Sequence, residues 1–418
     1  MKIVIHRGAH EVGGSCVELN FKDSTILLDV GLPLSHNFDD DIDSSLPQPL
    51  FQDLRQGAKK VDAVILSHAH LDHYGLAGVL PQGIPIYCGE ASVKLMALSK
   101  EVSPKGIPMF KSEAFQDRKT FQVGDFSVTP YLMDHSAFDA YGFLISSGGK
   151  SIFYTGDFRG HGRKSRLFKL LLKDPPKGDV LLMEGTLFGE RSEGRVVSEF
   201  QLEKKFVKLI KETNGIVLVT TGSQNIDRLV TIFKAAQQTN RMLILDFYTA
   251  EVLGRLKKYA RLPQASWPRI KVCYPQRIAD RFERIGLKDI LSRHRKNGIN
   301  WRRLKEIEGR VVMLIRPGFL WDLKTFLDLK GGTWIYSMWH GYFDQSKSLR
   351  NLKSYLEEKD VRIEELHTSG HATISELTDL ANALNPKMII PIHTFHPEKF
   401  KDYFSNVRLV NNGEELEI

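Results

Sequence analysis

The sequence predicts an α/β protein in which one α/β unit is inserted into another. Two observations support this fold class. Up to Met183, short apolar runs separated by turns predict a series of strands. From residue 198 onward, helical and strand patterns alternate, which indicates a parallel sheet with crossover connections. Because no internal repeat, low-complexity tract or long linker interrupts the chain, we expect compact units without a flexible tether.

The first part is expected to consist mainly of strands. Gly13-Gly14 and Lys22-Asp23 mark early corners, and Gly148-Gly149 is the turn of an expected hairpin. The predicted strands cover residues 2–6, 15–21, 24–29, 61–66, 84–87, 126–132, 141–146, 150–155 and 179–183.

The second part begins with a predicted helix at 198–213, because Phe200, Leu202, Phe206, Leu209 and Ile210 recur at helical spacing. Strands are expected at 216–220, 242–246, 311–315 and 333–337, with helices at 226–236, 250–256, 278–293 and 301–308. The last section predicts a helix at 346–358, a strand at 364–367, a helix at 374–384 and a strand at 388–392.

The composition is that of an ordinary soluble globular protein. Of the 418 residues, 42% are hydrophobic and 26% charged, and no apolar run approaches the ~18 residues that suggest a membrane helix. Residues 1–6 are typical of a strand and not of a signal peptide. Cys16, Cys88 and Cys273 form no CxxC pair, so we expect reduced, mostly buried thiols in a cytoplasmic protein with no membrane partner.

The charge is basic, with 58 lysines and arginines against 50 acidic residues and a pI near 9.1. Basic clusters at 255–261, 293–296 and 301–305 lie near Tyr and Trp residues, a combination that favours a nucleic-acid backbone as partner. A solvated helical face would give the same pattern, and both interpretations stay open here.

The stretch His68-Ala-His70-Leu-Asp72-His73 is the densest group of metal-ligand residue types in the chain. It follows an apolar run that predicts a buried strand. Imidazole and carboxylate groups suit Zn²⁺, and so short a run holds ligands for two ions only as a turn or the start of a helix. The alternative is a polar surface loop.

Five further polar residues are each expected where an apolar strand ends. They are Asp29, His135, Asp157, His371 and His393. Residues at strand ends line the rim of a sheet, where sites form on α/β scaffolds. Singly, each has an ordinary explanation as a turn former, a helix cap or a hydrogen-bonded histidine. Together with the histidine cluster, they predict one metal site.

The order LLDVG, HAHLDH, MDHS and YTGDF, followed by two later histidines, resembles the metallo-β-lactamase fold. That fold is a four-layer αββα sandwich with a dinuclear metal site along one edge. The middle section, together with TSGH at 368–371 and PIHT at 391–394, resembles the β-CASP branch. This branch includes RNase J and the cleavage-and-polyadenylation endonucleases, nucleases with an α/β domain inserted in the metallo-β-lactamase domain. The implied boundaries are 1–195, 196–345 and 346–418.

The resemblance implies two zinc ions, with manganese as an alternative metal, and a role for each candidate residue. One ion would be bound by His68, His70 and His135, the other by Asp72, His73 and His393, with Asp157 bridging both. Asp29 would orient a ligand histidine. The residues implied in catalysis are Asp72, Glu184 and His371; Glu184 would hydrogen-bond near His371, which would contact the scissile phosphate and protonate the leaving oxygen.

Physical chemistry supports this assignment. Two ions ~3.5–4 Å apart lower the pKa of a shared water, so that hydroxide forms at neutral pH and attacks a phosphodiester. In the family, a histidine at position 393 accompanies RNA-processing members, so the resemblance implies a ribonuclease, whether an exonuclease or an endonuclease. The alternatives are a DNA exonuclease or repair nuclease on the same scaffold, a small-molecule metallo-hydrolase, and a non-catalytic RNA-binding subunit.

Four polar residues of the inserted part are candidates for phosphate or RNA contacts. The stretch 220–228 lies between a strand and a helix, where backbone amides with Ser223 and Gln224 would hold a phosphate. The alternative is a helix cap with a surface pair between Asp227 and Arg228. The other two candidates are Ser337 and Ser369, and His340 is not expected to be catalytic.

Overall fold

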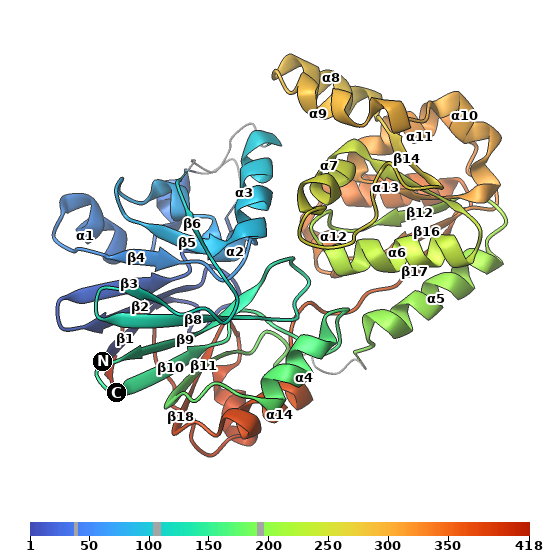
Figure 1. Cartoon of the computed structure of the whole chain (residues 1–418). Helices are drawn as coiled ribbons and strands as arrows, with labels where there is room; N and C mark the ends of the chain where they lie inside the picture. The colour runs from blue at the N-terminus through green and yellow to red at the C-terminus, as the bar shows by residue number, and fades with distance from the viewer. Residues whose placement is uncertain (37–40, 103–109, 190–195) are drawn as a thin grey trace. The chain divides into compact units, whose positions relative to one another are not determined.

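The computed structural model describes residues 1–36, 41–102, 110–189 and 196–418 (Figure 1). The chain divides into two compact units, Met1–Val196 with Gly370–Ile418 and, inserted between them, Val197–Ser369. The expected boundary at residue 195 lies outside the described residues. The expected boundary at 345/346 differs from the structure, because the segment that follows it adds a strand to the sheet of the inserted unit.

The first unit contains two sheets. The seven-stranded sheet has the order β19 (Glu415–Glu417), β1 (Lys2–Arg7), β2 (Cys16–Phe21), β3 (Ser24–Leu28), β4 (Ala63–Ile65), β5 (Ile86–Gly89) and β6 (Glu113–Phe115). The six-stranded sheet has the order β18 (Met388–Ile392), β11 (Val180–Glu184), β10 (Lys150–Tyr154), β9 (Tyr141–Ser147), β8 (Phe126–Leu132) and β7 (Phe121–Val123).

Alternating side chains along the strands build the layers of this unit. In β10, Ile152 and Tyr154 belong to a core that joins the two sheets, whereas Phe153 faces the opposite way, toward Leu171 and Leu377. These last residues come from α4 (Ser165–Lys173) and α14 (Ile374–Leu384), and α1 (Leu50–Gln56), α2 (Leu71–Tyr74) and α3 (Glu90–Val102) accompany the other sheet (Figure 1). The predicted αββα sandwich is confirmed.

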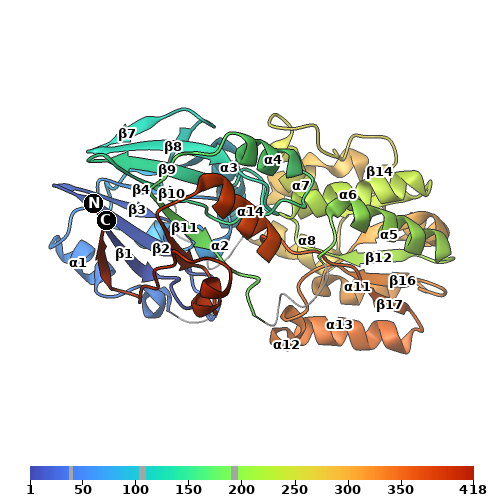
Figure 2. The same ribbon diagram turned by 90° about the horizontal axis from the view of Figure 1, so that it is seen from below.

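The inserted unit is built on one parallel sheet, as predicted. Its strands have the order β14 (Ile270–Cys273), β13 (Met242–Asp246), β15 (Val311–Leu314), β12 (Val217–Thr220), β16 (Thr333–Tyr336) and β17 (Arg362–Glu365), and every pairing is parallel. Helices flank both faces of this sheet (Figure 2). They are α5 (Glu199–Glu212), α6 (Ile226–Gln238) and α7 (Phe247–Leu256) on one side, and α10 (Trp301–Glu306), α11 (Leu320–Phe326) and α13 (Lys347–Glu358) on the other.

The helix expected at 278–293 is two helices, α8 (Gln276–Arg284) and α9 (Lys288–Arg293). Gly286, with φ of 84°, lies between them, in a conformation that a helix interior does not tolerate. All three cysteines are buried and free, as expected. Among the described residues, no helix has the length and apolarity needed to cross a membrane.

A fully buried ion pair fixes the start of α6. Arg228 donates to Glu199, with Nη2 to Oε1 at 3.0 Å, and also to the Ser337 and Thr368 carbonyl oxygens. The side chains of Arg228 and Glu199 are both 0% exposed. The surface pair between Asp227 and Arg228 that the sequence left open is therefore wrong, whereas the helix cap is present, because Asn225 accepts from the Arg228 amide.

We expect Glu199→Ala to lower the free energy of unfolding by about 3–5 kcal/mol, because the substitution leaves a buried guanidinium without its counter-charge. Urea unfolding followed by circular dichroism measures this loss. The matched control is Glu212→Ala on the same helix, which removes exposed ion pairs worth about 1 kcal/mol or less. Equal losses in the two variants would contradict a structural role for the buried pair.

Candidate metal centre

The candidate site lies entirely within the first unit, in loops that follow its strands. Asp29 follows β3, His68 follows β4, His135 follows β8, Asp157 follows β10 and His393 follows β18. His70 is the N-cap of the short helix α2, and that helix carries Asp72 and His73. The histidine cluster is thus the start of a helix, one of the two conformations that the sequence allowed.

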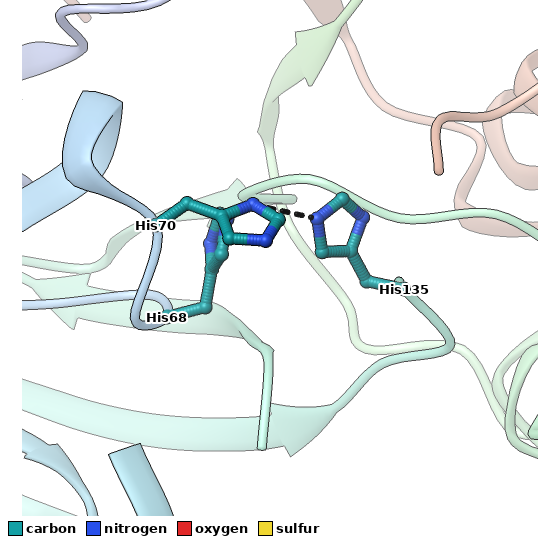
Figure 3. Close-up of side chains that lie close together, drawn as sticks. All are labelled: His68, His70 and His135. Carbon is teal, nitrogen blue, oxygen red and sulfur yellow. Dashed lines mark hydrogen bonds between the residues drawn. The ribbon is translucent and has the colours of Figure 1, made fainter. Parts of the chain in front are cut away.

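Three histidines form the first ligand group (Figure 3). His68 Nε2 lies 3.0 Å from His70 Nδ1, which lies 3.4 Å from His135 Nε2. Burial, together with neighbouring imidazoles, lowers the pKa of His68, and burial likewise lowers the pKa of His70 and His135. Neutral imidazoles whose nitrogens converge in this way are suitable ligands for a transition metal.

Asp72, His73 and His393 form the second ligand group, and their ligand atoms lie within 4.8 Å of one another. His393 Nε2 is 3.4 Å from Asp72 Oδ2. Burial raises the pKa of the Asp72 carboxyl, but the hydrogen bond from His393 and the nearby His73 outweigh burial and hold the pKa below its usual range. Asp72 is therefore an ionised carboxylate at neutral pH, the form that a metal ligand requires.

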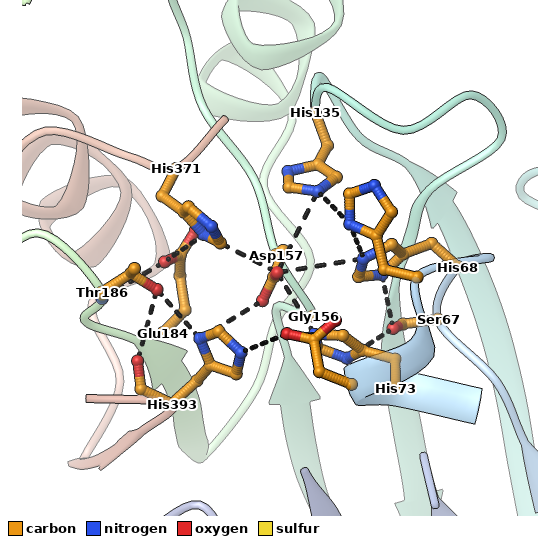
Figure 4. A network of polar contacts seen from close by, with 12 residues as sticks. Ser67, His68, His73, His135, Gly156, Asp157, Glu184, Thr186, His371 and His393 are labelled. Atoms are coloured by element: carbon orange, nitrogen blue, oxygen red, sulfur yellow. Dashed lines mark hydrogen bonds and ion pairs between the residues drawn. The ribbon is translucent and has the colours of Figure 1, made fainter. Parts of the chain in front are cut away.

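Asp157 lies between the two groups (Figure 4). Its Oδ2 is 3.2 Å from His73 Nε2 and 3.8 Å from His68 Nε2, and its Oδ1 is 3.8 Å from His393 Nδ1. The side chain is 2% exposed, yet neither oxygen accepts a hydrogen bond from any described residue. A buried carboxylate without a donor is costly, and a shared cation would satisfy both oxygens. The residues present thus fit a metal centre.

Asp29 holds His73 in place. It accepts from His73 Nδ1 at 2.8 Å, from the Tyr154 hydroxyl at 2.6 Å, and from the Ser67 amide and hydroxyl at 2.7 and 2.8 Å. Because Nδ1 of His73 carries the donated proton, Nε2 is left to face Asp157. This is the orienting role expected for Asp29. Sequence reasoning missed Ser67 and Tyr154; Ser67 directly precedes the histidine cluster, and Tyr154 lies in an ordinary core pattern.

Two other ligand histidines have similar support. His135 Nδ1 donates to the Gly370 carbonyl at 2.7 Å, and His393 Nδ1 donates to the Thr186 hydroxyl at 2.9 Å. The Thr186 hydroxyl in turn donates to the His393 carbonyl. No sequence pattern distinguishes Gly370 or Thr186, because backbone carbonyls and isolated hydroxyls occur throughout any chain.

Glu184 and His371 form the expected pair beside the ligands. His371 Nδ1 lies 3.1 Å from Glu184 Oε2 and 3.6 Å from Asp157 Oδ2. Burial lowers the pKa of His371, but the two carboxylates outweigh burial and raise it to about 9. Glu184 also accepts from the Phe158 and Ala372 amides, so its oxygens are occupied by the protein and serve to hold His371.

The candidate phosphate-contact residues of the inserted unit have other partners. Ser337 is 1% exposed, donates to the Leu366 carbonyl and accepts from Arg228. Ser223 is buried and bonds to Thr249 and Arg316. For these two serines, a phosphate contact through the hydroxyl disagrees with the structure, because both hydroxyls serve internal networks.

The remaining polar candidates are accessible. Gln224 and Ser369 are partly exposed, and their role in RNA contacts stays a prediction. His340 and His396 are on the surface, where they pair with Glu365 and Glu398 at 3.0 and 3.2 Å. Neither histidine belongs to the metal centre.

Comparison with known proteins identifies two domain matches in the chain. Residues 26–222 match the Beta-lactamase superfamily domain, and residues 346–408 match the Zn-dependent metallo-hydrolase RNA specificity domain. The chain therefore combines a metallo-β-lactamase superfamily domain with an RNA specificity domain, as its resemblance to the β-CASP branch implied. The first matched range contains six of the seven candidate ligands, and the second contains His393 and His371.

Alignments with curated relatives cover nearly the whole chain. It is 25% identical to "Ribonuclease J" of Mycoplasma pneumoniae over 94% of this chain and 67% of that protein. It is 24% identical to "Probable RNase MJ4" of Methanocaldococcus jannaschii over 94% of this chain and 93% of that protein. The fold matches a crystal structure of an Enterococcus faecalis protein of unknown function with a TM-score of 0.80, at 23% identity over 99% of both chains.

We expect Asp29→Asn to weaken zinc binding about 10- to 100-fold, because His73 loses the carboxylate that fixes its orientation. Titration of the metal-free protein with zinc against a competing chelator measures the affinity. Asp139→Asn is the matched control, since Asp139 also has a positive φ and accepts from a backbone amide and a tyrosine but contacts no ligand histidine. Similar losses in both variants would contradict the orienting role.

Proposed function

We propose that this protein is a metal-dependent ribonuclease that hydrolyses RNA phosphodiester bonds at a two-zinc centre. The observation that carries the proposal is the Asp157 carboxylate, which is buried without hydrogen-bond donors between two groups of three ligands. Two cations that share a carboxylate are the arrangement that stabilises attacking and leaving oxygens in phosphodiester hydrolysis.

RNA is the substrate that the relatives support. Curated relatives carry the name Ribonuclease J, and the C-terminal match is to an RNA specificity domain. The net charge of +8 suits a polyanion, which agrees with this assignment. In the β-CASP branch, a histidine at position 393 accompanies RNA-processing members.

The ions would be held by His68, His70 and His135 on one side and by Asp72, His73 and His393 on the other. When bound, they would supply a nucleophilic hydroxide at neutral pH and neutralise charge on the phosphoryl group. The protein itself holds the side chains of the candidate ligands in fixed positions. Asp29, Thr186 and the Gly370 carbonyl fix three of the imidazoles, so the ligand atoms are in position before a substrate arrives.

His371 is placed to protonate the leaving oxygen of the reaction. It lies beside Asp157 but is partly exposed, at 22%, and it is held by Glu184. A protonated imidazole in this position contacts the scissile phosphate and donates its Nε2 proton to the leaving ribose oxygen. Glu184 accepts from Nδ1 and thereby orients the ring, so it is a positioning residue.

Asp72→Ala is expected to abolish RNA cleavage while the protein stays folded, because the second ligand group loses its carboxylate. The assay uses RNA labelled at either end, with a 5′-monophosphate or a 5′-hydroxyl, beside DNA of equal sequence. Cleavage of the RNA by the wild-type protein must stop on chelation and return with zinc. Undiminished cleavage by a folded Asp72→Ala protein would overturn the mechanism, and preferential cleavage of the DNA would overturn the substrate.

His371→Ala is expected to lower kcat about 100- to 10,000-fold and to leave zinc content unchanged, since His371 acts on the leaving oxygen and binds no metal in this proposal. Single-turnover cleavage and metal analysis of the same preparation measure the two quantities. His396→Ala is the matched control, because His396 is a surface histidine that also pairs with a glutamate. Loss of zinc from the His371→Ala protein would make His371 a ligand instead.

A further inference from the structure

The inserted unit has a cavity of about 550 Å³ at the amino ends of β13 and β14. Its wall includes Phe233 from α6 and Trp267 from the loop before β14, with ring centroids 5.6 Å apart in an edge-to-face arrangement. The volume lies in the range of small-ligand pockets, roughly 300–1,000 Å³. In a parallel sheet this end is opposite the turn at 221–225, which follows the carboxyl end of β12.

Among the described residues, three arginines and no acidic side chain line this cavity. Arg241 is buried, and its guanidinium donates to the carbonyls of Gly215, Thr213 and Val311, so it is a fixed part of the wall. Arg261 and Arg269 are exposed, and neither forms an ion pair with any described residue. The Arg261 guanidinium lies 6.0 Å from the centre of the Trp267 ring. The cavity thus combines aromatic faces with uncompensated positive charge.

The backbone at the rim is strained. Asn240 and Arg269 both have positive φ, 57° and 64°, a conformation that costs a non-glycine residue roughly 1–3 kcal/mol. Arg269 hydrogen-bonds to the carbonyl of Asn240, which ties the two strained residues together. Strain of this kind persists where the surrounding structure holds a side chain in a required direction. Here it places a cationic side chain at the mouth of the cavity.

We propose that this cavity binds one nucleotide of single-stranded RNA, with the base stacked on Trp267 and the flanking phosphates near Arg261 and Arg269. The proposal rests on the proposed function and gives the enzyme a second contact with its substrate, in the unit that does not contain the candidate metal ligands. Aromatic faces with adjacent guanidinium groups are the means by which proteins bind single strands without reading their sequence. An acidic peptide would use the arginines but would leave the Trp267 face without a partner.

The test measures binding in the presence of EDTA, so that no cleavage occurs. A fluorescein-labelled oligoadenylate and an equally long oligomer of abasic sugar phosphates are the probes. Trp267→Leu is expected to weaken oligoadenylate binding about tenfold, the loss of one base–aromatic stack, and to leave binding of the abasic oligomer unchanged. Trp267→Phe keeps an aromatic face and should restore most of the lost affinity.

Arg261→Glu is expected to weaken binding of both oligomers and to reduce the slope of log affinity against log salt by about 0.7, one phosphate contact on a single strand. The matched control is Arg284→Glu, an equal charge change at an exposed arginine of α8, which follows the carboxyl end of β14 and lies outside the basic clusters. At physiological salt it should change the dissociation constant by no more than about twofold, because this residue does not line the cavity and salt screens exposed charges. Circular dichroism melting verifies the fold of every variant.

Three outcomes would overturn the proposal: equal effects of the two arginine substitutions, unchanged binding in a folded Trp267→Leu protein, or competition by polyglutamate as strong as that by RNA. The last outcome would make the cavity an acidic-polymer site. Cleavage by the wild-type protein is measured separately. If the wild-type protein cleaves RNA but the cavity variants bind RNA as tightly as the wild type does, only the cavity proposal is refuted. If RNA binds through the cavity but the wild-type protein cleaves none of it, only the ribonuclease function is refuted.

Discussion

The Asp157 carboxylate sets the main constraint on the first unit. Burial opposes its ionisation, yet His393, His73 and His371 hold its pKa well below the usual range. Neither oxygen accepts a hydrogen bond, so the protein itself leaves the negative charge incompletely satisfied. Such a group is stable in a buried position only with opposite charge close by, which the imidazoles supply here and a bound cation would supply more strongly, because an uncompensated buried charge costs several kcal/mol. The loops after the strands serve this purpose, since each brings an imidazole or a carboxylate to the same point.

The two sheets are joined at the site by a polar contact as well as by the apolar core. Asp29 follows β3 of one sheet, and Tyr154 is the last residue of β10 in the other; their hydrogen bond of 2.6 Å crosses between the sheets. Asp29 and His393 have φ of 57° and 55°, so two of the strand ends are held in an unfavourable conformation. The sandwich and the metal centre are therefore not independent, because the contact that orients His73 also fixes the spacing of the sheets.

Sequence reasoning found the groups whose chemistry is rare and missed those whose chemistry is common. Asp29, Asp157 and the histidines were identifiable because a charged or imidazole side chain at the end of an apolar strand is unusual. Tyr154 follows the alternation of a core strand, and nothing in the sequence separates it from other tyrosines. Ser337 was assigned to RNA wrongly for the complementary reason: its hydroxyl serves Arg228, a partner 109 residues away that no local pattern reveals. The parallel sheet was predictable from long periodic segments, whereas three-residue strands such as β6 and β7 have too few residues to show a period.

The inserted unit uses its polar groups differently at the two ends of its sheet. At the carboxyl ends, Ser223 and Ser337 are bonded to Arg316 and Arg228, and these arginines are themselves paired with Asp246 and Glu199. These two arginines stabilise the fold, and their carboxylate partners balance their charge. At the amino ends, Arg261 and Arg269 pair with no described carboxylate. An excess of positive charge therefore acts on a polyanion only where arginines lack acidic partners, so net charge by itself does not locate a nucleic-acid contact. What distinguishes this end of the sheet is that no acidic side chain in the described part of the chain lines the cavity, and not the number of its arginines.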